Sequence, residues 1–154
     1  MKIKAASLLT HKQAVRRIAQ WLKMTKQHKV VITELSTAAG ETPDVLSFYN
    51  GCSSMLVEVK VSRSDFLADK HKEWRRDTER GMGMRRYFAA PKGIISIEDL
   101  PEGWGLLEIG DTQIRELKES GRHVANRDNE ITVLLSVMRR LEIATCVYVV
   151  GESD

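Results

Sequence analysis

Apolar residues near the start of the chain recur at helical spacing. Thr10 is a residue type that caps helix N-termini, so the pattern predicts a helix from about Thr10 to His28. We expect its apolar side to pack against a sheet. That side consists of Ala14, Val15, Ile18, Trp21, Leu22 and Thr25.

Strand-like segments follow this helix. Residues 29–36 read as a first strand, on which Ile32, Glu34 and Ser36 share one face. Residues 43–60 read as two strands joined at Asn50-Gly51, because both residues of this dipeptide tolerate the positive φ of a tight hairpin turn. The segment after the turn is rich in β-branched residues, which favour strands.

The pattern then alternates between helix and strand. Ser62 and Asp65 have the spacing of a capping box, which predicts a helix over 64–80 whose packed side includes Leu67. A strand is predicted over 84–90. Two further strands, over 105–109 and 113–117, form a predicted hairpin.

The last part of the chain carries a clear apolar stripe on a predicted helix. We expect this helix either to cover a sheet face or to pair with another subunit. Residues 145–150 are predicted to form a short strand or an ordered tail. The stripe is Ile131, Leu134, Leu135, Met138 and Leu141.

These elements predict one α/β domain over residues 1–154. The sheet is expected to be mixed, antiparallel at its start and parallel after the central helix, with helices flanking it. A strand, helix and strand in succession imply a parallel pair with a right-handed crossover. A chain of 154 residues is long enough for one core and too short for two comfortable ones.

Charged residues on the predicted hairpin suggest a chemical site. Because side chains alternate along strands, an antiparallel pair can bring Asp44, Glu58 and Lys60 together. Two carboxylates and an amine are costly to bury without compensation, and a divalent cation would compensate them. The plain alternative is a solvated face or an ordinary ion pair, since Glu-x-Lys alone is weak evidence.

Pro43-Asp44, followed after thirteen residues by Glu58-Val59-Lys60, resembles the signature of the PD-(D/E)xK nuclease superfamily. Within it, the chain is most similar to small bacterial DNA repair proteins of the MmcB kind, over roughly residues 29–118. The segments that carry this narrower likeness are Thr33-Glu34, Pro43-Asp44, Val57 to Ser62, Asp65-Phe66-x-x-Asp69-Lys70, Tyr87 to Pro91 and Gly105-Leu106-Leu107.

The resemblance implies a restriction-endonuclease-like core that cleaves a DNA phosphodiester. Asp44 and Glu58 would bind Mg²⁺ or Mn²⁺, with the carbonyl of Val59 as a further ligand. Lys60 would orient or activate the attacking water. Glu34 is a weaker candidate ligand or base, because an early acid of this superfamily often lies on a helix instead.

The net charge is only +3, but basic residues are concentrated in two segments. Residues 1–33 contain eight Lys or Arg and no acid, whereas residues 98–154 contain twelve acids and six bases. This asymmetry suggests a face for a polyanion, and an ordinary solvated surface is an equally open alternative from charge alone. The predicted DNA contacts are Lys12, Arg16, Lys23 and Lys26, with Arg75, Arg76 and Arg80 as a second group.

Composition narrows the classes of protein to which the chain could belong. No apolar run approaches transmembrane length and no signal peptide is visible, so we expect no membrane contact and a cytoplasmic protein. Two cysteines fit a reducing compartment, and four scattered histidines argue against a zinc site.

Two other functions stay open from the sequence. The first is a DNA-binding accessory protein that kept a nuclease fold without turnover. The second is a subunit whose acidic C-terminal half docks a protein partner or a second copy. Metal-dependent nicking, DNA affinity without nicking, and protein capture without DNA affinity would distinguish the three.

Overall fold

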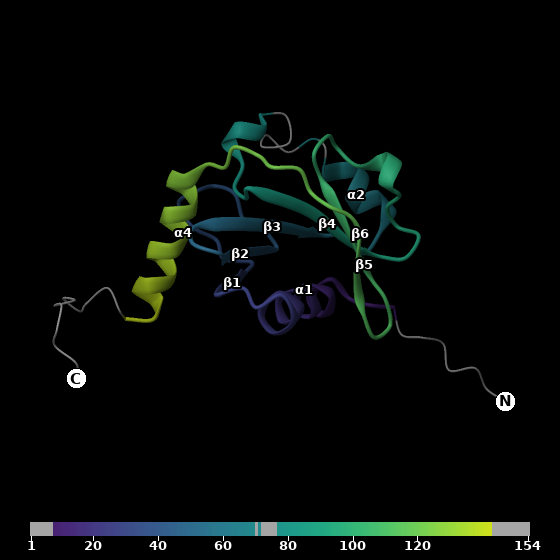
Figure 1. The fold of residues 1–154 in the computed structure, drawn as a ribbon, viewed down its shortest axis with the longest axis horizontal. Coiled ribbons are helices and arrows are strands. Elements are labelled where there is room, and N and C mark those ends of the chain that lie inside the picture. The colour runs from purple at the N-terminus through teal and green to yellow at the C-terminus, as the bar shows by residue number, and fades with distance from the viewer. Residues whose placement is uncertain (1–7, 70, 72–76, 143–154) are drawn as a thin grey trace.

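A computed structural model describes residues 8–69, 71 and 77–142 of the chain. Its centre is one six-stranded sheet in which the strands lie in chain order (Figure 1). The pairs β3–β4 and β4–β5 are parallel and the other pairs are antiparallel, so the predicted mixed sheet is confirmed. The strands are β1 (Val30–Thr33), β2 (Val45–Tyr49), β3 (Ser53–Val59), β4 (Arg85–Pro91), β5 (Gly105–Ile109) and β6 (Ile114–Lys118).

The hairpin of β2 and β3 forms as predicted. Asn50 and Gly51 adopt φ values of 39° and 75°, the left-handed conformations that the turn requires. The register pairs Val45 with Val57 and Leu46 with Leu56. It therefore brings the start of β2 beside the end of β3, where the sequence predicts the site.

Helices cover both faces of the sheet, with α1 (His11–Gln20) on one and α2 (Arg63–Asp69) on the other (Figure 1). Ala14, Val15, Ile18 and Leu22 are buried in the core beneath α1, as predicted. The second core, on the α2 side, includes Leu46, Leu56, Phe66 and Phe88. This two-sided burial explains why the central strands are apolar on both faces.

The first helix begins as predicted but ends early. Thr10 caps α1, and the Gln13 side chain bonds back to the Thr10 backbone in a reciprocal capping box. The chain widens into a π-helix, η1 (Trp21–Thr25), and the left-handed φ of 57° at Gln27 stops it before His28. Thr25 is exposed, so its predicted place on the packed side is wrong.

The predicted helix over 64–80 is not continuous in the described part of the chain. Helix α2 ends at Asp69, and a short 3₁₀ helix, η2 (Thr78–Arg80), follows an extended Asp77. Residues 70 and 72–76, including Arg75 and Arg76, lie outside the described residues. Leu67 is 46% exposed, because Phe66 takes the buried side of α2 instead. A second 3₁₀ helix, η3 (Ile97–Asp99), lies between β4 and β5.

The last helix, α4 (Arg127–Arg140), does not pack through its predicted stripe. Ile131, Leu135, Met138 and Leu141 are 42–65% exposed, and Leu134 alone of the stripe packs against the core. The side that faces inward carries Glu130, Val133 and Ser136. The predicted strand over 145–150 lies outside the described residues. Within the part of the chain that is described, no helix has the length and apolarity to cross a membrane.

A buried carboxylate on α4 explains this orientation. Glu130 is 1% exposed, and its Oε1 accepts hydrogen bonds from Ser54 Oγ at 2.6 Å and from the backbone N–H of Gly83 at 2.9 Å. Its Oε2 pairs with Arg127 at 2.6 Å. These bonds attach α4 to the start of β3 and to the loop before β4.

We expect Glu130→Ala to lower the free energy of unfolding by about 3 kcal/mol, because it leaves buried donors without their acceptor. Asp128→Ala, which removes an exposed acid from the same helical turn, is the control and should change stability by less than about 0.5 kcal/mol. Urea denaturation of both variants measures this. Equal losses would show that Glu130 does not anchor the helix.

Candidate functional site

Asp44 lies immediately before β2, where that strand stops pairing with β3. Its Oδ2 accepts a hydrogen bond of 2.7 Å from the backbone N–H of Val59. The next N–H along, that of Lys60, points the other way and bonds to Ala89 of β4. The Asp44 carboxylate therefore takes the place of a backbone carbonyl at the end of the ladder, which fixes its position while leaving Oδ1 outside this bond.

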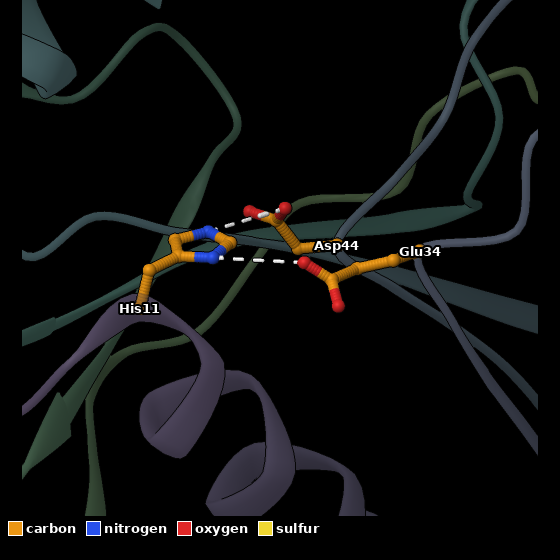
Figure 2. Close-up of side chains that lie close together, drawn as sticks. All are labelled: His11, Glu34 and Asp44. Atoms are coloured by element: carbon orange, nitrogen blue, oxygen red, sulfur yellow. Dashed lines mark ion pairs between the residues drawn. The ribbon is translucent and has the colours of Figure 1, made fainter.

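Two further side chains, from other elements, lie close to Asp44 (Figure 2). His11, the first residue of α1, places its Nε2 3.3 Å from Asp44 Oδ1 and its Nδ1 3.6 Å from Glu34 Oε1. Glu34 follows β1 in a left-handed conformation, with a φ of 46°. Its backbone N–H bonds to the carbonyl of Asp44, so the two acids are held at neighbouring strand ends.

Glu58 and Lys60 lie on the α2 side of β3. Lys60 Nζ is 3.0 Å from Asp69 Oδ1 and 4.0 Å from Glu58 Oε2. All three residues are buried: Lys60 is 4% exposed, Asp69 is 3% exposed and Glu58 is 2% exposed. Such burial is costly for charges, and the mutual pairing offsets part of that cost.

The cluster around Asp44 and the cluster around Lys60 lie beside each other along the β2–β3 hairpin. Continuing the register by one residue beyond Val45 and Val57 places Asp44 opposite Glu58. Val59, whose N–H holds Asp44, lies between Glu58 and Lys60 in sequence, and its side chain is buried under α1. The structure thus brings the sequence-predicted Asp44, Glu58, Val59 and Lys60 to one end of the hairpin, with Glu34 beside them.

Sequence reasoning missed two members of this region as site residues. His11 is one of four scattered histidines. Only its position directly after the predicted helix cap distinguishes it in the sequence. The sequence indicates Asp69 only as part of a segment that carries the family likeness. Its spacing of three residues from Phe66 puts both on one side of a helix, and this is the signal that could have found it.

Five of the seven predicted basic residues lie in the described part of the chain. Lys12 and Arg16 are exposed on α1, Lys23 is exposed on η1, and Lys26 is exposed directly after η1. Arg80 ends η2, which leads into Met82 of the opposite core. Arg80, the member of the second group that the structure describes, therefore lies next to a segment that packs on the face opposite α1.

A groove of about 1230 Å³ runs beside α1, between η1, the free edge of β1, the β5–β6 turn and the end of α4. Arg17, Lys23 and Lys29 line it, and no acidic side chain lines it among the residues described. Lys23 Nζ also donates to the carbonyl of Lys29 at 3.0 Å. The groove wall is thus positively charged.

His28, where the chain enters β1, is structural. Its Nδ1 is 2.8 Å from Ser47 Oγ, and its ring stacks on Tyr49 with centroids 4.5 Å apart. Burial, together with the nearby charge of Lys26, lowers the pKa of His28 below its ordinary value. It is therefore not placed to serve the site at the other end of α1.

A family model described as "DNA repair protein MmcB-like" matches residues 4–142 of the chain. A solved structure with a similar fold is the SPO1766 protein of unknown function from Silicibacter pomeroyi. It is 22% identical with a TM-score of 0.67, over 96% of this chain and 100% of that one. At this identity the likeness shows the fold alone. No curated protein matches the chain.

Proposed function

The chain belongs to the MmcB-like family of DNA repair proteins, and from this premise we propose that it is a nuclease that hydrolyses DNA phosphodiester bonds with the help of Mg²⁺ or Mn²⁺. The observation that carries the proposal is the end of the β2–β3 hairpin. There Asp44 is anchored on the Val59 N–H and is opposite Glu58 in the continued register, and Lys60 directly follows Val59 in the chain.

The donor chemistry of this end fits a hard divalent cation. Asp44 and Glu58 offer carboxylate oxygens, which such cations prefer, and Val59 offers a backbone carbonyl. A bound ion would neutralise charge that develops on the phosphoryl oxygens and the leaving oxygen. Glu34 would support Asp44 from the neighbouring strand.

Lys60 would orient the attacking water and carry part of the charge that the reaction develops. Its ammonium is 3.0 Å from Asp69, which limits where the amine can lie. Asp69 is thereby proposed as a positioning residue for Lys60. The side chain of Lys60 is almost fully buried, and a charge acts more strongly there than in open water.

A second function is favoured by the ion pairs themselves. Asp44 is already paired with His11, and Lys60 with Asp69. A protein that kept the fold to bind DNA or a partner without turnover would retain such pairs as internal supports. The exposed apolar side chains of α4 keep docking of a partner, or of a second copy, as a further proposal.

The deciding experiment is a cleavage screen. The full chain is incubated with single-stranded, duplex, flap and junction DNA in Mg²⁺, Mn²⁺ or EDTA, beside Asp44→Ala purified in parallel. Nicking that requires metal and Asp44 supports the nuclease. DNA binding with no nicking on any substrate would support the accessory protein instead.

We propose that DNA lies along the basic side of α1 and the adjoining groove. Replacing Lys12, Arg16, Lys23 and Lys26 together by Gln is expected to weaken duplex binding whatever the sequence, because phosphate contacts release condensed counterions. The slope of log affinity against log salt should flatten by roughly 0.9 for each phosphate that the variant no longer neutralises. Fluorescence anisotropy over a series of salt concentrations measures both effects.

A matched control replaces basic residues outside this surface. Arg115, Lys118, Arg122 and Arg139 replaced together by Gln change the net charge equally. If this control flattens the slope as much as the α1 variant does, binding depends on total charge and the proposed path is wrong.

A further inference from the structure

The ring of His11 lies between the carboxylates of Glu34 and Asp44 (Figure 2). Glu34 Oε1 faces one ring nitrogen of His11, at 3.6 Å from Nδ1, and Asp44 Oδ1 faces the other, at 3.3 Å from Nε2. A histidine that binds a metal commonly donates its other ring N–H to a carboxylate, which fixes the ring and its tautomer. His11 has the same order of groups, with Glu34 at ion-pair distance from Nδ1 and Asp44 beside Nε2.

The spacing on the Asp44 side fits two ligands of one ion. Ligand atoms about 2.1 Å from a metal lie roughly 3.0–3.4 Å apart at octahedral or tetrahedral angles. The distance of 3.3 Å between His11 Nε2 and Asp44 Oδ1 falls in this range. One ligand atom from each of His11, Glu34 and Asp44 lies within 4.8 Å of the others.

The surrounding backbone holds the three groups from separate elements. Asp44 Oδ2 is tied to the Val59 N–H, which leaves Oδ1 directed to His11. His11 is fixed by the capped start of α1, and Glu34 by its own N–H on Asp44 and its left-handed φ. A left-handed conformation at a non-glycine residue costs free energy, so it is often retained where a side chain must be aimed.

We propose that His11 Nε2 is a ligand of the metal held by Asp44, with Glu34 as the positioning residue that orients the imidazole. This inference rests on the metal site of the proposed function and adds the selectivity of that site. A nitrogen ligand suits Mn²⁺ and the later transition ions, whereas Mg²⁺ prefers oxygen. The site therefore selects Mn²⁺ over Mg²⁺.

The test is metal binding by the full chain, without DNA. Free Mn²⁺ is measured by electron paramagnetic resonance, and Mg²⁺ is measured by its competition with Mn²⁺. Wild type is expected to bind Mn²⁺ at least tenfold tighter than Mg²⁺. His11→Ala should lose about tenfold to a hundredfold in Mn²⁺ affinity but less than about threefold for Mg²⁺, and Glu34→Gln should lose part of the Mn²⁺ preference.

His71→Ala, which removes an exposed histidine after α2, is the matched control and should leave both affinities unchanged. Nuclear magnetic resonance of the histidine rings adds a further readout, since bound Mn²⁺ should broaden the His11 signals at a much lower Mn²⁺ concentration than those of His71. Circular dichroism establishes that each variant is folded. An unchanged ratio of Mn²⁺ to Mg²⁺ affinity in His11→Ala would show that the three residues form an ion bridge only.

The two proposals can fail separately. Cleavage that persists in His11→Ala with the same metal preference overturns the ligand and leaves the nuclease. Mn²⁺ binding that depends on His11, in a protein that cleaves none of the DNA substrates, leaves the ligand and overturns the nuclease.

Discussion

Asp44→Ala, Glu58→Ala and Lys60→Ala are each expected to lower the rate of DNA cleavage by about a hundredfold or more. Loss of one charge-stabilising or proton-transferring group commonly costs this much. Asp44 is partly exposed, whereas Glu58 and Lys60 are buried, so the Asp44 variant should retain the most stability. Single-turnover cleavage, with substrate fully bound, measures the effect on chemistry.

Asp65→Ala removes an exposed acid from α2 and provides the control for charge and handling. Its rate should match wild type within a factor of about two. Each variant is also melted, so that a lost rate is compared with the folded fraction. Undiminished cleavage by folded Glu58→Ala would refute the assignment of this end of the hairpin as the active site.

Local sequence rules were sufficient for most of the sheet, although the first strand, predicted over 29–36, ends at Thr33 because Glu34 adopts a left-handed φ of 46°. The positive φ values at Asn50-Gly51 pin the hairpin turn, and the turn sets the register that brings Asp44 opposite Glu58. Alternation along β3 then places Glu58 and Lys60 on one face. These features depend on neighbouring residues and on strand period, which a sequence displays directly.

The helices were less predictable because their packing is decided by distant partners. The buried side of α4 is set by Glu130, whose hydrogen-bond donors lie on β3 and on the loop before β4. A buried carboxylate reads as a solvent-facing residue in any hydrophobic pattern, so the predicted stripe was rotated away from the true core. The π-helix that begins at Trp21 changes the helical period and exposes Thr25 in the same way.

The candidate site was only partly predictable for the same reason, because some of its residues come from elements that are distant in the sequence. Asp44, Glu58 and Lys60 come from adjacent strands, and their proximity follows from the hairpin. His11 and Asp69 reach them from α1 and α2, on opposite faces of the sheet. The spacing of Asp69 from Phe66 indicates that it faces the sheet, but it does not indicate which strand residue it meets. Whether the predicted residues act in catalysis stays a prediction for the experiments above.

Lys60→Met and Asp69→Leu are each expected to lower the free energy of unfolding by about 3 kcal/mol, because each removes one member of a buried ion pair whose charged atoms are 3.0 Å apart. The double variant should lose clearly less than the sum of the two, since it removes both members of the pair. The lost contact between Lys60 and Glu58 is the same in Lys60→Met and in the double variant, so it does not enter the coupling energy. Urea denaturation of the four proteins completes this cycle. Additive losses would show that the pair is not energetically coupled.

The same double variant separates the structural role of Lys60 from its catalytic role. It is expected to remain folded at room temperature and yet to show no cleavage, because the amine that would orient the attacking water is missing. Asp69→Asn keeps Lys60 but loosens its position, and should reduce the turnover rate while leaving DNA affinity unchanged. Cleavage by the folded double variant at the wild-type rate would mean that Lys60 serves only the core of the protein.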